Sequence, residues 1–291
     1  MFNQRGLGYV PDLPKVEDYS DTHPEVSKLL SAANIGSGAA GGAVAALPAV
    51  VDLRPWFSPV EDQGYLGSCT ANAAAGLLEY NERRARGRFV DASRLFLYKA
   101  ERDLLGWTGD TGAYLRTAME ALVLFGAPPE HYWPYDGNPP ASNPHYNVEP
   151  PAFCYAFGSA YQALTYFRHD PAGTPAATVL NNIRTYVAAG IPAMFGFPVY
   201  PEYDSPLPGG LIGYPVAGQT SRGGHANVVA GYDDNLMIGG DKGALLVRNS
   251  WGPAWGVGGY GWLSYKYVTS ALANDFWSMI TAKWLDTGNF G

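Results

Sequence analysis

The sequence predicts an α+β fold with two lobes and a cleft between them. Helical patterns dominate the first half of the chain and strand patterns dominate the second half, so the two kinds of element fall into separate lobes. The chain has 291 residues, of which 47% are hydrophobic, and it contains 8 Trp, 20 Tyr and 12 Phe, which is enough to bury a sizeable core. A cleft between two lobes is a natural site for a ligand.

The N-terminal region differs in composition from the rest of the chain. Its first 30 residues are polar and contain several prolines, and a Gly- and Ala-rich linker follows up to residue 47. The start lacks the continuous apolar stretch of a secretory signal, and no window is apolar enough to span a bilayer. We therefore expect no membrane partner and a cytoplasmic or non-classically exported protein. The expected organisation is an N-terminal extension, 1–47, and a globular domain, 48–291, with 48–150 mainly helical and 151–291 mainly strands.

Three helices and four strands have clear signals. The first helix begins at Ser68 or Cys69, with Ser68 as its expected N-cap, and it ends in a basic turn before Gly87. The second and third helices are expected at about 112–125 and 175–189, each ended by Gly and Pro. Runs of apolar and aromatic residues between Gly, Pro and Asp turns predict strands. These strands are 193–199, 226–232, 244–249 and 260–267.

Charge and cysteine content exclude several classes of protein. The net charge is −7, and no large basic block is present, so we expect no nucleic-acid partner. Two cysteines, Cys69 and Cys154, allow at most one bridge, which is too few for a disulfide-stabilised scaffold. Cys154 stands between Phe and Tyr and is interpreted as a small buried residue.

Cys69 has a setting that favours reactivity. A thiol at the start of a helix faces the positive end of the helix dipole and unpaired N–H groups, and both stabilise the thiolate. A histidine nearby would make it an activated nucleophile. His225 is the candidate, because it opens an apolar strand directly after Gly223 and Gly224.

Asn249 is a candidate partner for that histidine. It ends an expected strand, and an amide oxygen there can accept a hydrogen bond from an imidazole and fix its tautomer. Taken alone, His225 and Asn249 are each more typical of an ordinary structural residue than of a catalyst. Their combination with Cys69 is what points to nucleophilic catalysis.

Three blocks of sequence together resemble the papain family of cysteine peptidases. They are Gln63-Gly-Tyr-Leu-Gly-Ser-Cys69, Gly-His-Ala at 224–226, and Asn249-Ser-Trp-Gly-Pro-Ala-Trp-Gly256. Weaker similarity extends over about 48–280. The resemblance implies a papain-like fold, in which a helical lobe faces an antiparallel β-barrel-like lobe across the active-site cleft.

The resemblance also implies a role for each residue. Cys69 would attack the scissile carbonyl, and His225 would pair with it as an imidazolium and later protonate the leaving amine. Asn249 would orient His225, and Gln63 would donate its amide to the oxyanion alongside the Cys69 N–H. In the family the paired thiol has a pKa of roughly 3–4, so the resting site is an ion pair. The tryptophans after Asn249, Trp251 and Trp255, would keep water away from the His–Asn contact.

Substrate contacts are implied with less specific wording. Gly112, with Thr111 and Ala113, falls where the family binds an extended peptide backbone. Side-chain preference is set by a pocket beside the histidine, where Gly224 leaves room. The expected substrate is a peptide or protein, and no cofactor or metal is expected.

Two departures from the family pattern stand out. Leu66 replaces a cysteine that usually forms a disulfide, and Thr70 replaces the usual Trp or Tyr. The lobes are therefore expected to cohere through packing alone. The family's prosegment is longer and helical, whereas 1–47 is short and mostly non-helical. We expect about 9–30 to fold back over the cleft as a short inhibitory segment, with a mobile tail as the alternative.

Three functions fit these residues. The first is a cysteine endopeptidase that works through a thioester acyl-enzyme. The second is an acyl transferase or peptide ligase with the same residues. The third is a catalytically silent peptide-binding homologue, which the intact set Gln63, Cys69, His225 and Asn249 argues against.

Overall fold

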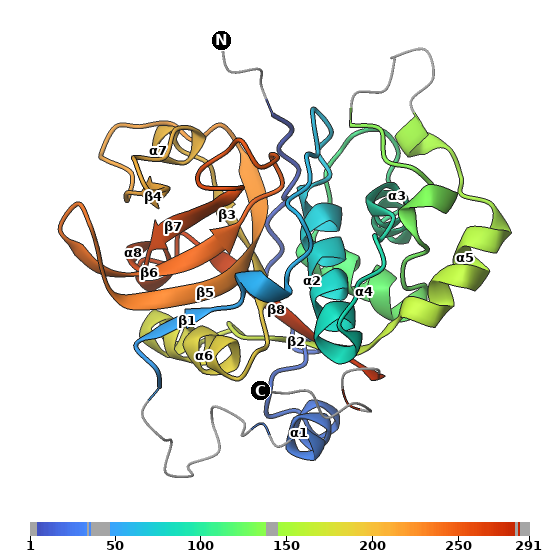
Figure 1. Ribbon diagram of the computed structural model, residues 1–291, viewed down its shortest axis with the longest axis horizontal. Helices are drawn as coiled ribbons and strands as arrows, with labels where there is room; N and C mark the ends of the chain where they lie inside the picture. Colours follow the sequence, from blue (N-terminus) through green and yellow to red (C-terminus); the bar gives the residue numbers. More distant parts are fainter. Residues whose placement is uncertain (1–4, 34, 36–46, 138–144, 283–284, 286–291) are drawn as a thin grey trace.

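A helical lobe and a β lobe lie side by side, and the N-terminal segment runs between them (Figure 1). The architecture comes from a computed structural model that describes residues 5–33, 35, 47–137, 145–282 and 285. Among these residues, no helix is both long enough and apolar enough to cross a bilayer.

The helical lobe is built around one central helix, α2. Short side chains on its first three turns let neighbouring elements approach closely, and almost all of its residues are buried. It ends at Gly87, which has the left-handed φ of 72° that glycine adopts without strain and whose N–H donates to the Arg83 carbonyl. The helices of this lobe are α2 (Cys69–Arg86), α3 (Arg94–Leu104), α4 (Leu115–Leu124) and α5 (Ala152–Gly158).

The β lobe contains one sheet with the strand order β2-β8-β3-β5-β6-β7-β4, and β1 pairs with β5. All pairings are antiparallel except that of β4 with β7. The β-barrel-like lobe implied by the resemblance therefore takes the form of an open sheet. The strands are β1 (Val50–Asp52), β2 (Ala163–Arg168), β3 (Ala193–Pro198), β4 (Leu211–Ile212), β5 (Gly224–Ile238), β6 (Asp241–Arg248), β7 (Tyr260–Ser264) and β8 (Asn274–Thr281).

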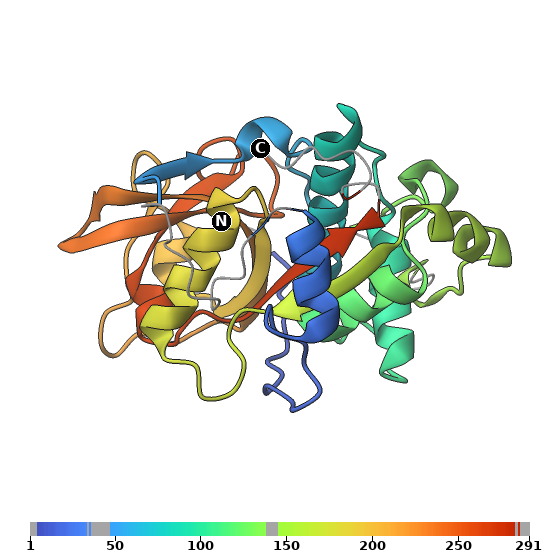
Figure 2. The ribbon, with the colours of Figure 1, turned by 90° about the horizontal axis from the view of Figure 1, so that it is seen from below.

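Four further helices pack around the sheet. Helix α1 lies beside β2 and β8 (Figure 2), where Val26 and Leu30 pack on Phe167 and Ile280 in a small second core. The extension, expected to be mostly non-helical, thus contains this one short helix among its described residues. The four are α1 (Pro24–Ala32), α6 (Ala176–Ala188), α7 (Pro201–Asp204) and α8 (Lys266–Thr269).

The predicted elements are all present, with different boundaries. The second helix starts later than expected, at Leu115, and the strand expected at 226–232 extends over Gly224–Ile238. The stretch 260–267 is divided between β7 and α8. Ser68 precedes α2 but makes no side-chain cap, because its hydroxyl bonds Tyr135 and Asn72 instead.

A buried arginine joins the two lobes in the absence of disulfides, since Cys69 and Cys154 are both free. Arg248 of β6 donates to the Ser58 hydroxyl at 3.1 Å and to the Pro59 carbonyl at 2.8 Å, and the Ser58 hydroxyl donates to Glu79 of α2. A Cβ on Gly76 would lie 2.7 Å from the guanidinium, so this glycine makes room for the arginine. The positive charge of Arg248 compensates the fully buried Glu79 carboxylate.

We expect Arg248→Ala to lower the free energy of unfolding by about 3–5 kcal/mol, because it removes the positive charge beside the buried Glu79 carboxyl and leaves that carboxyl only its hydrogen bonds from Ser58 and Ala92. Urea unfolding followed by tryptophan fluorescence measures the change. Arg88→Ala is the matched control, since Arg88 is exposed, and it should change stability by no more than about 0.5 kcal/mol. Equal effects of the two substitutions would contradict the proposed role of Arg248.

Candidate functional site

Packing of α2 on β5 brings the predicted nucleophile next to the predicted base. Cys69 is the first residue of α2 and is fully buried, and His225 is the second residue of β5. The thiol lies against the backbone of Ala226, the residue that follows His225. The helix start and the strand start, 156 positions apart in the chain, therefore meet across the lobe boundary.

His225 and Asn249 are joined as predicted. The imidazole Nε2 lies 2.8 Å from Asn249 Oδ1, which also accepts the Ser250 N–H at 2.8 Å. Because Oδ1 is an acceptor, Nε2 carries the proton and Nδ1 of the neutral ring is left as an acceptor. Nδ1 is buried and has no hydrogen-bond partner among the described residues, so it is free to take a proton from a thiol.

Aromatic rings shield the His–Asn contact. Trp251 lies with its ring centroid 4.7 Å from that of His225, as predicted for a cover. Trp255 packs one ring farther away, on Tyr203, and donates its indole N–H to the Tyr203 carbonyl. Tyr203 itself contacts His225, with 5.7 Å between ring centroids. The sequence carries no signal for Tyr203, since it stands in a loop-like stretch far from the motifs.

Gln63 is fully buried and is held in one orientation. The Ser250 hydroxyl donates to Gln63 Oε1 at 2.5 Å, so the amide nitrogen points the other way. Gln63 Nε2 donates to the Leu66 carbonyl at 2.8 Å and to the Gly6 carbonyl at 3.1 Å. The amide thus binds a peptide carbonyl oxygen of the N-terminal segment. A peptide substrate would present the same kind of oxygen, which becomes the oxyanion during attack.

The N-terminal segment, residues 5–10, occupies the cleft and forms an isolated parallel bridge with Ala113 at Tyr9. The Ala113 N–H donates to the Gly8 carbonyl at 2.9 Å, and the Val10 N–H donates to the Ala113 carbonyl at 3.0 Å. On the β lobe, the Tyr9 N–H donates to the Gly224 carbonyl at 3.2 Å. Ala113, predicted to bind substrate backbone, and Gly224, predicted to leave room for a substrate side chain, both bind the backbone of the N-terminal segment.

Two other predicted substrate-binding residues lie at the same place. A Cβ on Gly112, which has φ 71°, would fall 2.1 Å from the Gly8 carbonyl oxygen, so only glycine allows this close approach. Thr111 donates its hydroxyl to the Gly112 carbonyl and lines a cavity of about 470 Å³ together with Val10 and Trp107. These residues extend the cleft beyond the strand contact.

Close backbone packing holds the segment in place. A Cβ on Gly8 would fall 1.6 Å from the Gly67 carbonyl oxygen, and a Cβ on Gly6 would fall 2.0 Å from that of Leu66. Both distances are shorter than any real contact, so glycine is needed at each position. The loop before Cys69 and the N-terminal segment therefore fit together backbone against backbone.

Burial sets the charge state of the filled site. Burial raises the pKa of the Cys69 thiol to about 12, although nearby backbone groups of Ala226 and Gly8 oppose the shift. Burial also lowers the pKa of His225 to about 4, with the Asn249 hydrogen bond opposing it. Both shifts favour the neutral forms, so the ion pair implied by the resemblance is disfavoured while the segment fills the cleft.

Downstream of the cleft, acidic residues anchor the segment to the body of the protein. Arg116 of α4 pairs with Asp12 at 2.8 Å and also with Asp18. Arg168 of β2 lies 3.5 Å from Asp18. Residues 5–10 are the part of the extension that lies within the cleft, whereas about 9–30 was expected there. After residue 10 the chain turns away and runs along α4 and the edge of the sheet at β2.

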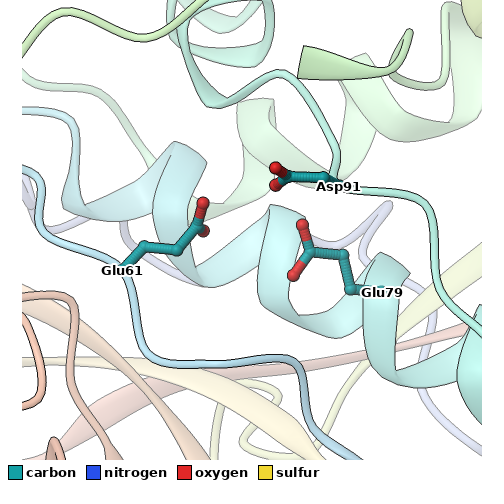
Figure 3. Close-up of side chains that lie close together, drawn as sticks. All are labelled: Glu61, Glu79 and Asp91. Carbon is teal, nitrogen blue, oxygen red and sulfur yellow. The ribbon is translucent and has the colours of Figure 1, made fainter. Parts of the chain in front are cut away.

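A second cluster of charged groups lies away from the thiol. Glu61, Glu79 and Asp91 each bring a carboxylate oxygen to within 4.8 Å of the others (Figure 3). Burial raises the pKa of Glu61 and Glu79, and Arg94 pairs with Glu61 at 2.9 Å. Protonation and arginine pairing therefore account for the closeness of these carboxyls, and we assign the cluster a structural role.

Comparison with known proteins agrees with this geometry. Residues 47–279 match the family model of the papain family cysteine proteases. A peptidase C1-like protein of Acanthamoeba polyphaga mimivirus is 33% identical over 94% of this chain and 86% of its own. The crystal structure of xylellain, a cysteine protease from Xylella fastidiosa, is 33% identical, with a TM-score of 0.76 over 97% of this chain and 99% of its own.

A more distant structure shares the fold alone. Procathepsin B S9 from Trypanosoma congolense is 16% identical, with a TM-score of 0.65 over 95% of this chain and 87% of its own. None of these matches favours the transferase or the silent reading. The match to the family model over most of the chain shows that this protein belongs to the papain family of cysteine proteases and is a cysteine peptidase.

Proposed function

We propose that the protein is an endopeptidase in which Cys69 is the nucleophile, and that residues 5–10 keep it latent. The observation that carries the proposal is the environment of His225. Its Nε2 is fixed by Asn249, while its buried Nδ1 has no hydrogen-bond partner in the described part of the chain. His225 lies on β5, the strand that packs against α2. An imidazole held in this way can accept a thiol proton and deliver it to a leaving amine.

The proposed reaction follows from the donors around the thiol. The Cys69 thiolate attacks the substrate carbonyl, and the negative charge on its oxygen is held by Gln63 Nε2 and the N–H of Cys69. The imidazolium of His225 gives its proton to the departing amine, which leaves a thioester. Water, deprotonated by His225, then attacks the thioester carbonyl and releases the acid and the free thiol.

Latency is supported by the contacts of the segment, which do not place one of its carbonyl groups against both Gln63 and Cys69. Gln63 Nε2 binds the carbonyl of Gly6, whereas the backbone of Gly8 lies against the Cys69 thiol. Cleavage requires one carbonyl to meet both groups at once. Since the two contacts belong to residues two positions apart, the segment fills the cleft without presenting a peptide bond for attack.

We expect Gly8→Ala in the full chain to open the cleft, because the new Cβ overlaps the Gly67 carbonyl. Overpacking costs about 1–3 kcal/mol, which shifts the opening equilibrium by about fivefold to 150-fold. The measurement is the rate at which iodoacetamide modifies Cys69, with Cys69→Ala as the blank.

Leu13→Ala is the control, because Leu13 belongs to the same segment but is 83% exposed. It should leave the modification rate unchanged. A Gly8→Ala protein that reacts no faster than the unaltered chain would show that the segment does not restrict access to the thiol.

We expect Gln63→Ala, introduced together with Gly8→Ala, to reduce kcat by about 10²–10³-fold with little change in KM, because one oxyanion donor is lost. Steady-state cleavage of a fluorogenic peptide measures both constants. Gln162→Ala is the control, since Gln162 is exposed and far from the cleft. A change in KM alone would instead assign Gln63 to ground-state binding.

The pH dependence of thiol modification should also differ between the two states. In the unaltered chain burial raises the pKa of Cys69 to about 12, so its modification rate should still be rising above pH 9. In Gly8→Ala the thiol regains solvent and can form the ion pair with His225, so the midpoint should move to lower pH. Identical midpoints in the two proteins would contradict this account.

A further inference from the structure

Tyr9 is the side chain of the N-terminal segment that enters the β lobe, and it is only 5% exposed. Its ring lies in a narrow slot between Gly196 of β3 and Gly224 of β5. A Cβ on Gly196 would fall 2.1 Å from a ring atom, and a Cβ on Gly224 would fall 3.0 Å from one. The two glycines thus leave flat walls that suit an aromatic ring.

The floor of this slot is polar. The Tyr9 hydroxyl donates to Asn274 Oδ1 at 2.9 Å, and Asn274 Nδ2 is turned toward the Ala271 carbonyl at 3.4 Å. Burial, and then the nearby carboxylate of Asp275, raise the pKa of the Tyr9 phenol, which keeps it protonated as a donor. The two groups near the phenol, Asn274 Oδ1 and the Asp275 carboxylate, are both hydrogen-bond acceptors. The floor is therefore complementary to a hydroxyl donor.

The turn that carries Asn274 is held in an unusual conformation. Ala271 and Asp275 have φ values of 58° and 60°, and they are the non-glycine residues with positive φ in the described part of the chain. Side chains with a Cβ rarely adopt this region. Asp170 accepts the N–H groups of Asp275 at 2.7 Å and Phe276 at 3.0 Å, which fixes the turn.

An arginine already balances the charge behind the floor. Arg168 Nη1 lies 3.0 Å from Asp275 Oδ1, and Arg168 Nε lies 3.0 Å from Asp170 Oδ1. With this pairing, a cationic side chain in the slot would approach a guanidinium as well as a carboxylate. A neutral phenol therefore fits the floor better than lysine or arginine does.

We propose that Asn274 makes this slot selective for a tyrosine side chain of the substrate, by accepting a hydrogen bond from the phenol hydroxyl. The inference rests on the proposed function, because it treats Tyr9 as occupying the place of a substrate side chain. Gly8 faces Cys69, and Tyr9 is the next residue. The slot would therefore take the side chain of the substrate residue next to the one that faces Cys69.

The first experiment tests the recognition without any cleavage. Tyr9→Phe and Asn274→Ala, each in the full chain, should both increase the rate of iodoacetamide modification of Cys69 by about fivefold, the worth of one hydrogen bond. The double variant should be no faster than either single variant, because both changes remove the same contact. Additive effects would overturn the assignment of Asn274 as the partner of the phenol.

The second experiment tests selectivity in the Gly8→Ala protein. The peptides differ only at the position that corresponds to Tyr9, where they carry Tyr, Phe, Leu or Arg. The value of kcat/KM should be highest for the Tyr peptide and about fivefold or more above that for the Phe peptide. Adding Asn274→Ala should bring the Tyr-to-Phe ratio close to one. Adding Asn235→Ala, a substitution of an exposed asparagine on β5, should leave the ratio as it was.

The outcomes separate the two proposals. A preference for Leu or Arg would overturn the specificity inference, and so would a Tyr-to-Phe ratio of kcat/KM that does not change with Asn274→Ala. Either outcome leaves the proposed peptidase function unaffected. Failure to cleave any peptide overturns the proposed function, while the coupling between Tyr9 and Asn274 in the first experiment still decides whether the slot recognises a phenol.

Discussion

The contact between the first turn of α2 and the first residues of β5 governs the whole arrangement. It joins a helix start from one lobe to a strand start from the other, so Cys69 comes to lie against the backbone beside His225. The same contact leaves the cleft lined on one side by Ala113 and on the other by Gly224. The N-terminal segment in the cleft is therefore bound by backbone groups of both lobes.

No disulfide holds the lobes together, since Cys69 and Cys154 are both free, and buried charged groups lie at their boundary instead. Arg248 of β6 donates to the Ser58 hydroxyl, which in turn donates to Glu79 of α2. Buried ion pairs add little net stability over apolar packing, but the loss of one partner is costly because the other charge stays buried. Such pairs therefore make the relative position of the lobes sensitive to single substitutions.

Much of the site could be predicted from sequence because its residues stand in short local motifs. Cys69 follows a glycine-rich turn at a helix start, and Asn249 precedes a Trp-rich turn. These motifs point to a catalytic site only in combination and through their resemblance to one family. The Gly8–Gly67 and Tyr9–Asn274 contacts could not be predicted. Gly6-Leu-Gly-Tyr9 has no periodicity, and its partners lie up to 265 positions away. Tyr203 was missed for the same reason, since only tertiary packing brings it to His225.

The N-terminal segment that we propose to be inhibitory and the cleft that it fills belong to one polypeptide, which has a consequence for how the enzyme would respond to dilution. A tethered ligand experiences an effective concentration in the millimolar range, independent of how much protein is present. Dilution dissociates an enzyme from a separate inhibitor protein and so activates it. Dilution cannot release a segment that belongs to the same chain. Release must come from a chemical event on the tether itself or from a competitor that binds the cleft more strongly than the strand does.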